Sequence, residues 1–308
     1  MIIGAALPAG DLSGAANSVE TLLAQTREAA AAGLRSVWFS QLFDHDALTL
    51  AALAGREVPG IAVGTAVVPL YPRHPLHLAA QAQTAQAATG GRFTLGVGLG
   101  VRGLLEPAFG FEYPPPIASL RESLVVLREV FEGGRPAFDG ETLTACPPLP
   151  TSVPGGGGVP IVVAAMGRQA LRVAGELADG TLPFLAGPRA LAEHIVPTLT
   201  KAAADAGRPE PRVIAAVPVV VTEDVEPVRQ IAAVHLGYYG DIPSYRRILD
   251  VEGVTHAAEL ALVGDERVVA AGLRRYFDAG ATEVVLIQSG MRSSRERLRT
   301  WELAGSLS

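Results

Sequence analysis

The segment GIAVGTAVVPLYPRHPLHLAAQAQTAQAATGGRFTLGVGLG, residues 60–100, decides the fold. An apolar run at 60–70 is followed by a stretch of helical period at 74–91, which Pro75 opens, and by a second apolar run at 92–100. Short apolar runs between turn formers indicate strands buried on both faces, and proline is favoured in the first turn of a helix. The segment therefore predicts a strand–helix–strand unit with parallel strands.

The same unit recurs along the whole chain. Each further apolar run is separated from the next by residues of helical period, and these runs predict strands at 2–8, 34–40, 159–165, 181–185, 211–222 and 283–287. Eight strands alternating with helices in 308 residues predict a (β/α)₈ barrel, formed by residues 1–308 as a single domain. A doubly wound sheet is the alternative.

Three insertions interrupt this alternation. Residues 101–116 follow the fourth strand and residues 235–262 follow the seventh. Active sites of barrels lie at the carboxyl ends of the strands, so we expect both insertions to cover a ligand. Residues 138–158 precede the fifth strand, at the opposite face, and are predicted to form a hairpin and a linker.

Composition bears on whether the protein binds nucleic acid, spans a membrane or is secreted. The chain is 49% hydrophobic with a formal net charge of −6, it shows no basic stripe, and no window of about 18 residues is free of charges and turn formers. We therefore expect neither nucleic-acid binding nor a membrane span. The single cysteine, Cys146, cannot form an internal disulfide, and no basic leader precedes the first strand. Both features predict a cytoplasmic protein.

Glycines follow the fourth strand in a dinucleotide-binding pattern, G-x-G-x-x-G, from Gly98 to Gly103. That motif requires a helix to begin at its third glycine, and we expect LLEPAFGFEYPPP (104–116) not to form one. The pattern is therefore not read as a dinucleotide site. Gly96, Gly98 and Gly100 share one face of the strand, which indicates either close approach of a ligand or crowding inside the barrel.

A charged trio stands at the end of the second strand, in WFSQLFDHDALT (38–49). Asp44, His45 and Asp46 resemble a metal or acid–base cluster, but consecutive side chains point in different directions. The favoured interpretation is that Asp44 or Asp46 caps the next helix, with His45 at the barrel mouth near a substrate. Metal is not expected, because His74 and His77 also lack a third ligand in sequence.

A turn and helix start follow the fifth strand, in AAMGRQALRVAGELADG (164–180). Free backbone N–H groups at a helix N-terminus form a natural anion site, to which Arg168 and Arg172 could add positive charge. The alternative is an ordinary strand-to-helix turn, of which every barrel has eight.

Three of these stretches together resemble one family. Residues 37–54, 64–100 and 164–180 look like the luciferase-like monooxygenase superfamily, and more specifically its branch that uses the deazaflavin coenzyme F420, such as methylenetetrahydromethanopterin reductase-like proteins. Residues 263–288 fit as well. The resemblance covers roughly residues 1–290 and is weak in the insertions 101–116 and 235–262. It is less specific for F420 over FMN, which stays the alternative cofactor.

The resemblance implies a set of cofactor contacts. A non-prolyl cis peptide between Ala66 and Val67 would lie behind the tricyclic ring, and the ring would explain the glycines of the fourth strand by ligand approach. The implied contacts are Ser40 and Gln41 at the polar edge of the ring, Gly98, Leu99 and Gly100 beside it, and Ala165, Met166, Gly167 and Arg168 at the phosphate.

The chain also departs from its sugar-phosphate- and alcohol-oxidising relatives. They carry Asp-His where this sequence has Gln41-Leu42, and the sugar-phosphate enzymes have Trp at Asp46 and Glu at Val101. The acid–base residues of alcohol oxidation are therefore missing at their expected places. We expect an F420-dependent oxidoreductase that reduces an activated C=C, C=N or C=O group of a small-molecule substrate.

The walls of the substrate site are expected from Phe43, His45 and the two insertions. The proton donor would be His45, or a tyrosine of the second insertion: Tyr238, Tyr239 or Tyr245. Rival hypotheses are an FMN-dependent monooxygenase, a non-catalytic flavin- or deazaflavin-binding protein and, weakest, a metal hydrolase. We also expect a homodimer.

Overall fold

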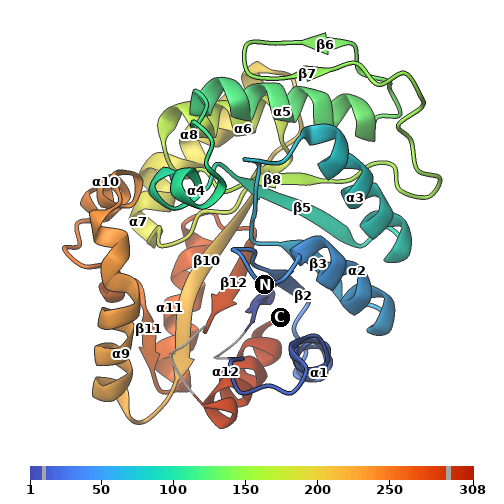
Figure 1. Cartoon of the computed structure of the whole chain (residues 1–308). Helices are drawn as coiled ribbons and strands as arrows, with labels where there is room; N and C mark the ends of the chain where they lie inside the picture. Colours follow the sequence, from blue (N-terminus) through green and yellow to red (C-terminus); the bar gives the residue numbers. More distant parts are fainter. Residues whose placement is uncertain (9–11, 289–292) are drawn as a thin grey trace.

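Eight parallel strands form a closed barrel in the computed structural model, which describes residues 1–8, 12–288 and 293–308 (Figure 1). In chain order the barrel strands are β1 (Ile2–Leu7), β2 (Ser36–Phe39), β3 (Ala62–Thr65), β5 (Phe93–Gly98), β8 (Ile161–Val163), β9 (Gly180–Thr181), β10 (Arg212–Val221) and β12 (Glu283–Ile287). Each pairs with the next, and β12 pairs with β1. The predicted (β/α)₈ barrel is confirmed and the doubly wound sheet is wrong.

Helices surround the barrel on its outer side (Figure 1). They are α1 (Ser18–Ala31), α2 (Ala47–Glu57), α3 (Pro75–Ala88), α5 (Pro116–Phe131), α6 (Arg168–Leu177), α7 (Pro188–Ala190) with the π-helix η1 (Leu191–Ile195) and α8 (Val196–Asp205), α11 (Glu266–Asp278) and α12 (Ser294–Leu307). Polar side chains satisfy the free N–H groups at the start of several helices: Asn17 caps α1, Asp46 caps α2 and Asp265 caps α11. The prediction of a helix cap at Asp46 is confirmed.

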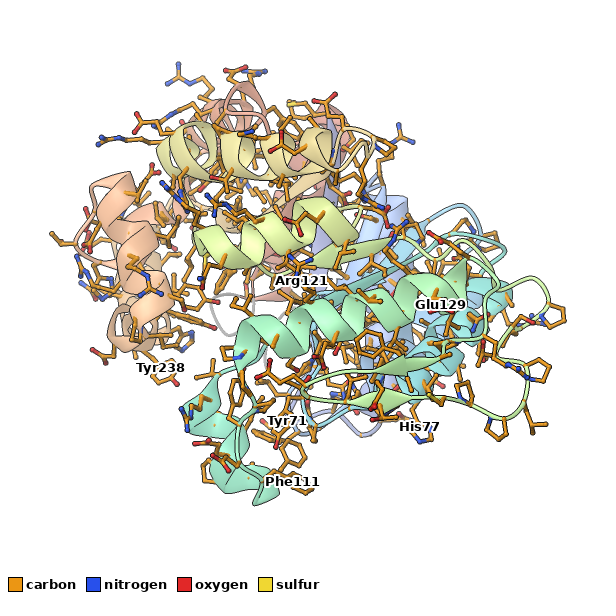
Figure 2. All side chains as sticks on the ribbon, turned by 90° about the horizontal axis from the view of Figure 1, so that it is seen from above. Tyr71, His77, Phe111, Arg121, Glu129 and Tyr238 are labelled. Carbon is orange, nitrogen blue, oxygen red and sulfur yellow. The ribbon has the colours of Figure 1, made fainter. Side chains whose placement is uncertain are left out.

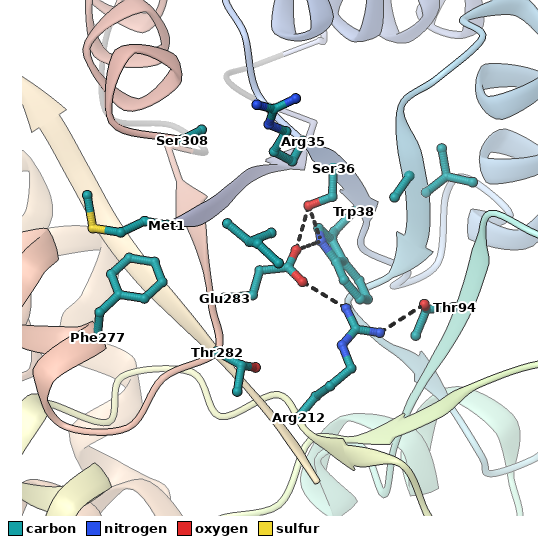
Figure 3. Close-up of a pocket in the computed structure, with 13 residues that line it drawn as sticks. Met1, Arg35, Ser36, Trp38, Thr94, Arg212, Phe277, Thr282, Glu283 and Ser308 are labelled. Carbon is teal, nitrogen blue, oxygen red and sulfur yellow. Dashed lines mark hydrogen bonds and ion pairs between the residues drawn. The ribbon is translucent and has the colours of Figure 1, made fainter. Parts of the chain in front are cut away.

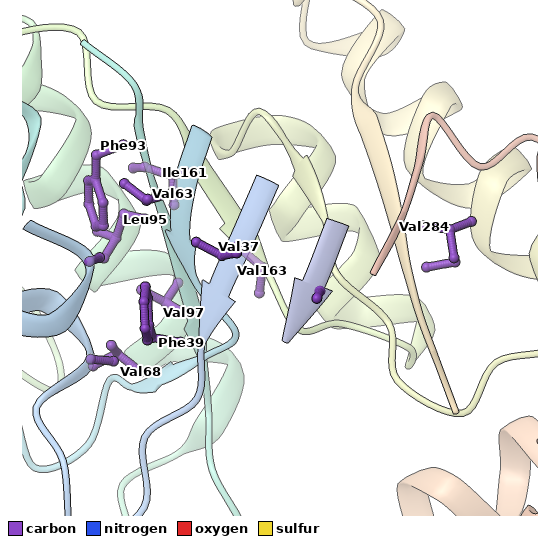
Figure 4. Packing of buried hydrophobic residues seen from close by; sticks show 14 of the residues in the cluster. Val37, Phe39, Val63, Val68, Phe93, Leu95, Val97, Ile161, Val163 and Val284 are labelled. Atoms are coloured by element: carbon purple, nitrogen blue, oxygen red, sulfur yellow. The ribbon is translucent and has the colours of Figure 1, made fainter. Parts of the chain in front are cut away.

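Side chains on the strands divide the core into two layers. One faces outward against the helices and includes Phe39, Leu95 and Val284 (Figure 4). The other fills the barrel, where Trp38, Val162 and the opposite strands meet. This alternation explains why the strands are apolar on both faces.

The first insertion contains a helix that the sequence analysis excluded. Helix α4 (Arg102–Phe109) begins directly after the fourth strand and ends at Gly110, whose φ of 70° suits glycine. Pro107 lies inside it, and its missing N–H removes a single intrahelical bond from a helix that ends two residues later. The expectation for residues 104–116 was wrong. The closed parallel barrel still excludes the Rossmann fold, in which the G-x-G-x-x-G pattern binds a dinucleotide.

The second insertion is also more helical than its sequence indicated. After α9 (Val225–Gly237) come the short helix η2 (Tyr238–Asp241), then α10 (Pro243–Glu252) and η3 (Ala257–Leu260). An additional strand, β11 (Leu262–Gly264), pairs with β10 outside the barrel. In Figure 1, α9 and α10 stand together at one edge of the molecule.

The third insertion agrees with its prediction. Strands β6 (Phe138–Asp139) and β7 (Thr144–Ala145) form an antiparallel hairpin, followed by a linker. In the described part of the chain, no helix combines the length and apolar character needed to cross a bilayer.

Candidate cofactor site

A bulge interrupts the third strand at its carboxyl end. The peptide between Ala66 and Val67 is cis, as the resemblance implied, and it separates β3 from the short strand β4 (Val68–Pro69). The Thr65 hydroxyl bridges to the neighbouring strand, because it donates to the Gly96 carbonyl at 2.7 Å and accepts from the Gly96 N–H at 2.8 Å. The Ser40 hydroxyl donates to the Ala66 carbonyl at 3.1 Å. Two side chains that the sequence analysis did not connect therefore fix the bulge.

The glycines of the fourth strand pack against this bulge. A Cβ atom on Gly96 would overlap the Thr65 carbonyl, and one on Gly98 would lie 2.8 Å from Cγ2 of Val67. Gly100 has a φ of 74°, which favours glycine for backbone reasons. Crowding inside the barrel thus accounts for glycine at Gly96 and Gly98. A contact between the cofactor and Gly98, Leu99 or Gly100 stays a prediction.

The loop after the second strand uses its polar groups to start α2. The amide oxygen of Gln41 accepts from the Ala47 N–H at 3.0 Å, and Asp46 accepts from the Thr49 N–H at 2.8 Å. Asp46 also forms an ion pair with Arg73 at 3.2 Å. Gln41 was predicted to meet the ring edge, and in this arrangement only its NH₂ group is free of the helix cap.

His45 engages both of its ring nitrogens with protein groups. Its Nδ1 lies 3.1 Å from the Asp44 carboxylate and its Nε2 lies 2.8 Å from the Ser18 hydroxyl. Burial raises the pKa of Asp44, but hydrogen bonds from backbone N–H groups and the His45 ring outweigh it, so this pKa lies below its usual value. A carboxylate only accepts, so Nδ1 carries a proton in its contact with Asp44. His45 therefore links the starts of α1 and α2.

The turn from β8 to α6 leaves its helix start open. Gly167 is the N-cap of α6, offers no side chain, and has open space where a Cβ would point. The first N–H groups of the helix are thus available to an anion. The Met166 carbonyl is held from the other side by Nε2 of His194 at 2.8 Å, a residue that the sequence analysis missed.

Aromatic side chains stand around the strand ends. The ring centroids of Phe43 and Phe109 are 6.0 Å apart, which brings the second strand end next to α4. The Tyr113 hydroxyl donates to the Leu99 carbonyl at 2.7 Å. On the other side, Phe184 contacts Tyr239, with centroids 5.2 Å apart. Residues of both insertions thus lie near the carboxyl ends of the strands. That they form the walls of a substrate site stays a prediction.

A cavity of about 690 Å³ opens at the other end, among residues that begin the strands (Figure 3). Glu283, only 3% exposed, accepts from the Ser36 hydroxyl at 2.5 Å and from Trp38 Nε1 at 3.0 Å, and it pairs with Arg212 at 2.8 Å. These groups satisfy one another. Residues at the amino-terminal end of a barrel usually serve stability, whereas active sites lie at the carboxyl ends of the strands. We therefore place the candidate site at the carboxyl ends.

The carboxyl-end residues fit a flavin-like cofactor. The open start of α6 suits a phosphate, and the cis peptide at Ala66–Val67 lies at the carboxyl end of the third strand, on the side where barrels bind their ligands. Metal chemistry finds less support. In residues 1–8, 12–288 and 293–308, no three His, Cys, Asp or Glu side chains gather to hold an ion. His74 instead caps α3 and contacts the Thr144 carbonyl.

Comparison with known proteins defines the class. The model of the luciferase-like monooxygenase family matches residues 2–283, so the chain belongs to this family of (β/α)₈ oxidoreductases. The "Putative coenzyme F420-dependent oxidoreductase" of Mycobacterium tuberculosis is 25% identical over 301 residues, covering 89% of this chain and 85% of that protein. An F420-dependent glucose-6-phosphate dehydrogenase of Rhodococcus erythropolis is 31% identical over 180 residues, covering 56% of this chain and 53% of the dehydrogenase.

Solved structures share the fold across both cofactor types. The F420-dependent tetrahydromethanopterin reductase of Methanopyrus kandleri has a TM-score of 0.75 at 22% identity, covering 98% of this chain and 96% of the other. A type II Baeyer–Villiger monooxygenase of Pseudomonas putida, in complex with FMN, has a TM-score of 0.76 at 18% identity, covering 99% and 97%. The fold alone therefore does not separate F420 from FMN.

Proposed function

We propose that the protein is an F420-dependent oxidoreductase that transfers hydride between the deazaflavin and a small organic substrate. The observation that carries this proposal is the open start of α6 behind Gly167, on a chain similar over most of its length to an F420-dependent oxidoreductase. Ser40, Gln41, Ala66, Val67, Gly98, Leu99 and Gly100 would surround the ring, and Ala165, Met166, Gly167 and Arg168 would hold the phosphate.

The direction that the site favours is reduction of an activated C=C, C=N or C=O group. When bound in its reduced form, the deazaflavin supplies a hydride and is oxidised, and the substrate takes up that hydride and a proton. Leu42 stands where alcohol-oxidising relatives carry His, and both nitrogens of His45 are already engaged. The residues here thus provide orientation and a protonated donor rather than a base that removes a proton from an alcohol.

The cofactor is tested by binding. F420 and FMN are titrated separately into the protein, and cofactor fluorescence gives each Kd. We expect F420 to bind at least tenfold more tightly than FMN. Tight FMN binding without affinity for F420 would support the FMN-dependent monooxygenase and overturn the proposal. F420 binding without turnover of any enone or imine would support a non-catalytic binding protein.

The phosphate position is tested at Gly167. Its φ of −77° and the open space at its Cβ allow other residues there. Gly167→Asp and Gly167→Asn both add a helix cap, but only Asp adds a negative charge next to the phosphate. We expect Asp to weaken F420 binding at least tenfold more than Asn does, with both variants at least as stable as the parent. Equal affinities of the two variants would place the phosphate elsewhere.

A further inference from the structure

We propose that an exposed apolar patch beside the candidate site binds the hydrophobic body of an uncharged substrate; this inference rests on the proposed function. The patch consists of Leu42, Phe43, Leu104, Phe109 and Phe111, which are between 40% and 69% exposed. Large apolar side chains that gather on a surface usually mark a binding site, whereas single ones need no explanation.

Ring contacts show that the patch is continuous across two segments. Phe43 follows the second strand and Phe109 ends α4, and their rings are in contact with centroids 6.0 Å apart. Phe111 meets Tyr71, which follows the third strand, at 6.3 Å. Figure 2 shows Tyr71 and Phe111 next to each other beside the α4 segment.

The basic side chains around the patch already have partners. Residues 40–46, 71–74 and 101–113 hold two arginines and two histidines. Arg102 pairs with Glu106 at 2.9 Å and Arg73 pairs with Asp46 at 3.2 Å. Both histidines bond to protein groups. A phosphate or carboxylate substrate would need a cation that is free to meet it, so this surface favours a neutral one.

The patch adjoins the candidate cofactor site. Leu42 lies two residues after Ser40, whose hydroxyl holds the Ala66 carbonyl at the bulge. Tyr113, at the end of the α4 segment, holds the Leu99 carbonyl at the end of β5. A substrate whose reacting group lies over the bulge would therefore extend its remaining atoms onto the patch.

The test uses 4-alkylcyclohexanones with chains from methyl to hexyl, which are products of enone reduction. They are titrated with F420 in its oxidised form, which has no hydride to donate, so no turnover competes with binding. Isothermal titration calorimetry measures their Kd on the protein with and without F420. Burying a methylene group contributes enough to predict about fourfold tighter binding for each CH₂ added. On the F420-loaded protein, where the cofactor phosphate would occupy the start of α6, hexyl phosphate should bind at least tenfold more weakly than the hexyl ketone. A ketone Kd that does not change with chain length, or tighter binding of hexyl phosphate than of the hexyl ketone, would overturn the inference.

Variants locate the binding surface. Leu42→Ser and Phe109→Ser change exposed side chains. In both variants the gain in ketone affinity should fall to less than about twofold for each CH₂ added. Leu149→Ser is the matched control, because Leu149 is 71% exposed on the linker after β7 and should leave the series unchanged. If ketone affinity rose equally with chain length in all three variants, the alkyl chain would bind elsewhere. If Leu42→Ser and Phe109→Ser dissociated a dimer without changing ketone affinity, the patch would be an interface between copies.

The two proposals can fail separately. If F420 binds but the alkyl series is flat, the substrate class is wrong and the cofactor stands. If the series is steep but F420 does not bind, the apolar site stands and the cofactor assignment is wrong.

Discussion

The ion pair at the amino-terminal end of the barrel makes a quantitative prediction about stability. Glu283 is 3% exposed and receives hydrogen bonds from Ser36 and Trp38, while Arg212 covers its second oxygen at 2.8 Å. The Arg212 side chain is 37% exposed and also reaches Thr94 at 3.3 Å. The Glu283 carboxylate depends more on Arg212 than Arg212 depends on the carboxylate, because water reaches the arginine side chain but not the buried carboxylate.

Single substitutions should therefore have unequal effects. Removing one partner of a buried ion pair costs about 3–5 kcal/mol, and we expect Arg212→Met to fall in that range because it strands a buried carboxylate. Glu283→Gln keeps the shape and leaves a cation that water reaches, so about 2 kcal/mol is expected. The double variant removes both charges and should be less destabilised than Arg212→Met alone, since replacing both members of a buried pair is often near neutral.

Urea unfolding followed by tryptophan fluorescence and circular dichroism measures these free energies, and the three variants complete a double-mutant cycle. We expect a coupling energy of at least about 2 kcal/mol. The view that the pair is effectively buried would be refuted if the two substitutions changed the free energy of unfolding additively. It would also be refuted if Arg212→Met lowered that free energy by less than about 1 kcal/mol. Lys201→Met provides a control, because its pair with Asp205 lies on the surface and should contribute little.

Two further predictions concern single side chains. Glu122 accepts from the N–H groups of residues 141–143 and from the Thr142 hydroxyl; burial raises its pKa, but these hydrogen bonds lower it below the usual value. Protection of the hairpin in hydrogen exchange should thus hold at neutral pH and be lost as the pH falls through that lowered pKa, and Glu122→Ala should abolish it at every pH. Within residues 1–8, 12–288 and 293–308, neither amide atom of the buried Gln288 side chain has a hydrogen-bond partner, so Gln288→Met should stabilise the protein by about 1 kcal/mol in urea unfolding; a loss of stability would mean that the amide has a partner.

The alternation of strands and helices was predictable because it depends on local pattern. The runs at 60–70 and 92–100 are apolar on both faces, and only a sheet covered by helices can bury both. The same local logic predicted that Asp44 or Asp46 caps the second helix, and the cap is Asp46. It failed for α4, because the sequence rule against Pro107 ignores how little a short terminal helix depends on one backbone hydrogen bond.

The site was less predictable because its contacts join distant residues. Thr65 meets Gly96 across 31 positions, and Ser40 meets Ala66 across 26. Neither pairing leaves a local pattern. The glycine alternation was visible, but the two explanations for it differ only in what occupies the space at the Cβ position. Only the coordinates show that Thr65 and Val67 occupy it at Gly96 and Gly98.

The proton that completes substrate reduction has to come from a side chain that is protonated at neutral pH, and Tyr239 is a candidate. Burial raises the pKa of Tyr239, with a further increase from Tyr238, and Tyr239 contacts Phe184, which packs at the top of the barrel interior with Val67. A phenol whose pKa lies above 10 keeps its proton throughout the neutral range and loses it only as the pH rises beyond that value. If Tyr239 supplies the proton, kcat/KM for enone reduction should be flat from about pH 6 to 9. A kcat/KM that varies with pH over that range, and whose pH dependence disappears in His45→Asn, would assign the proton to His45 instead. Tyr239→Phe should lower kcat more than it raises KM, because the hydroxyl acts on the developing charge and not on the bound substrate.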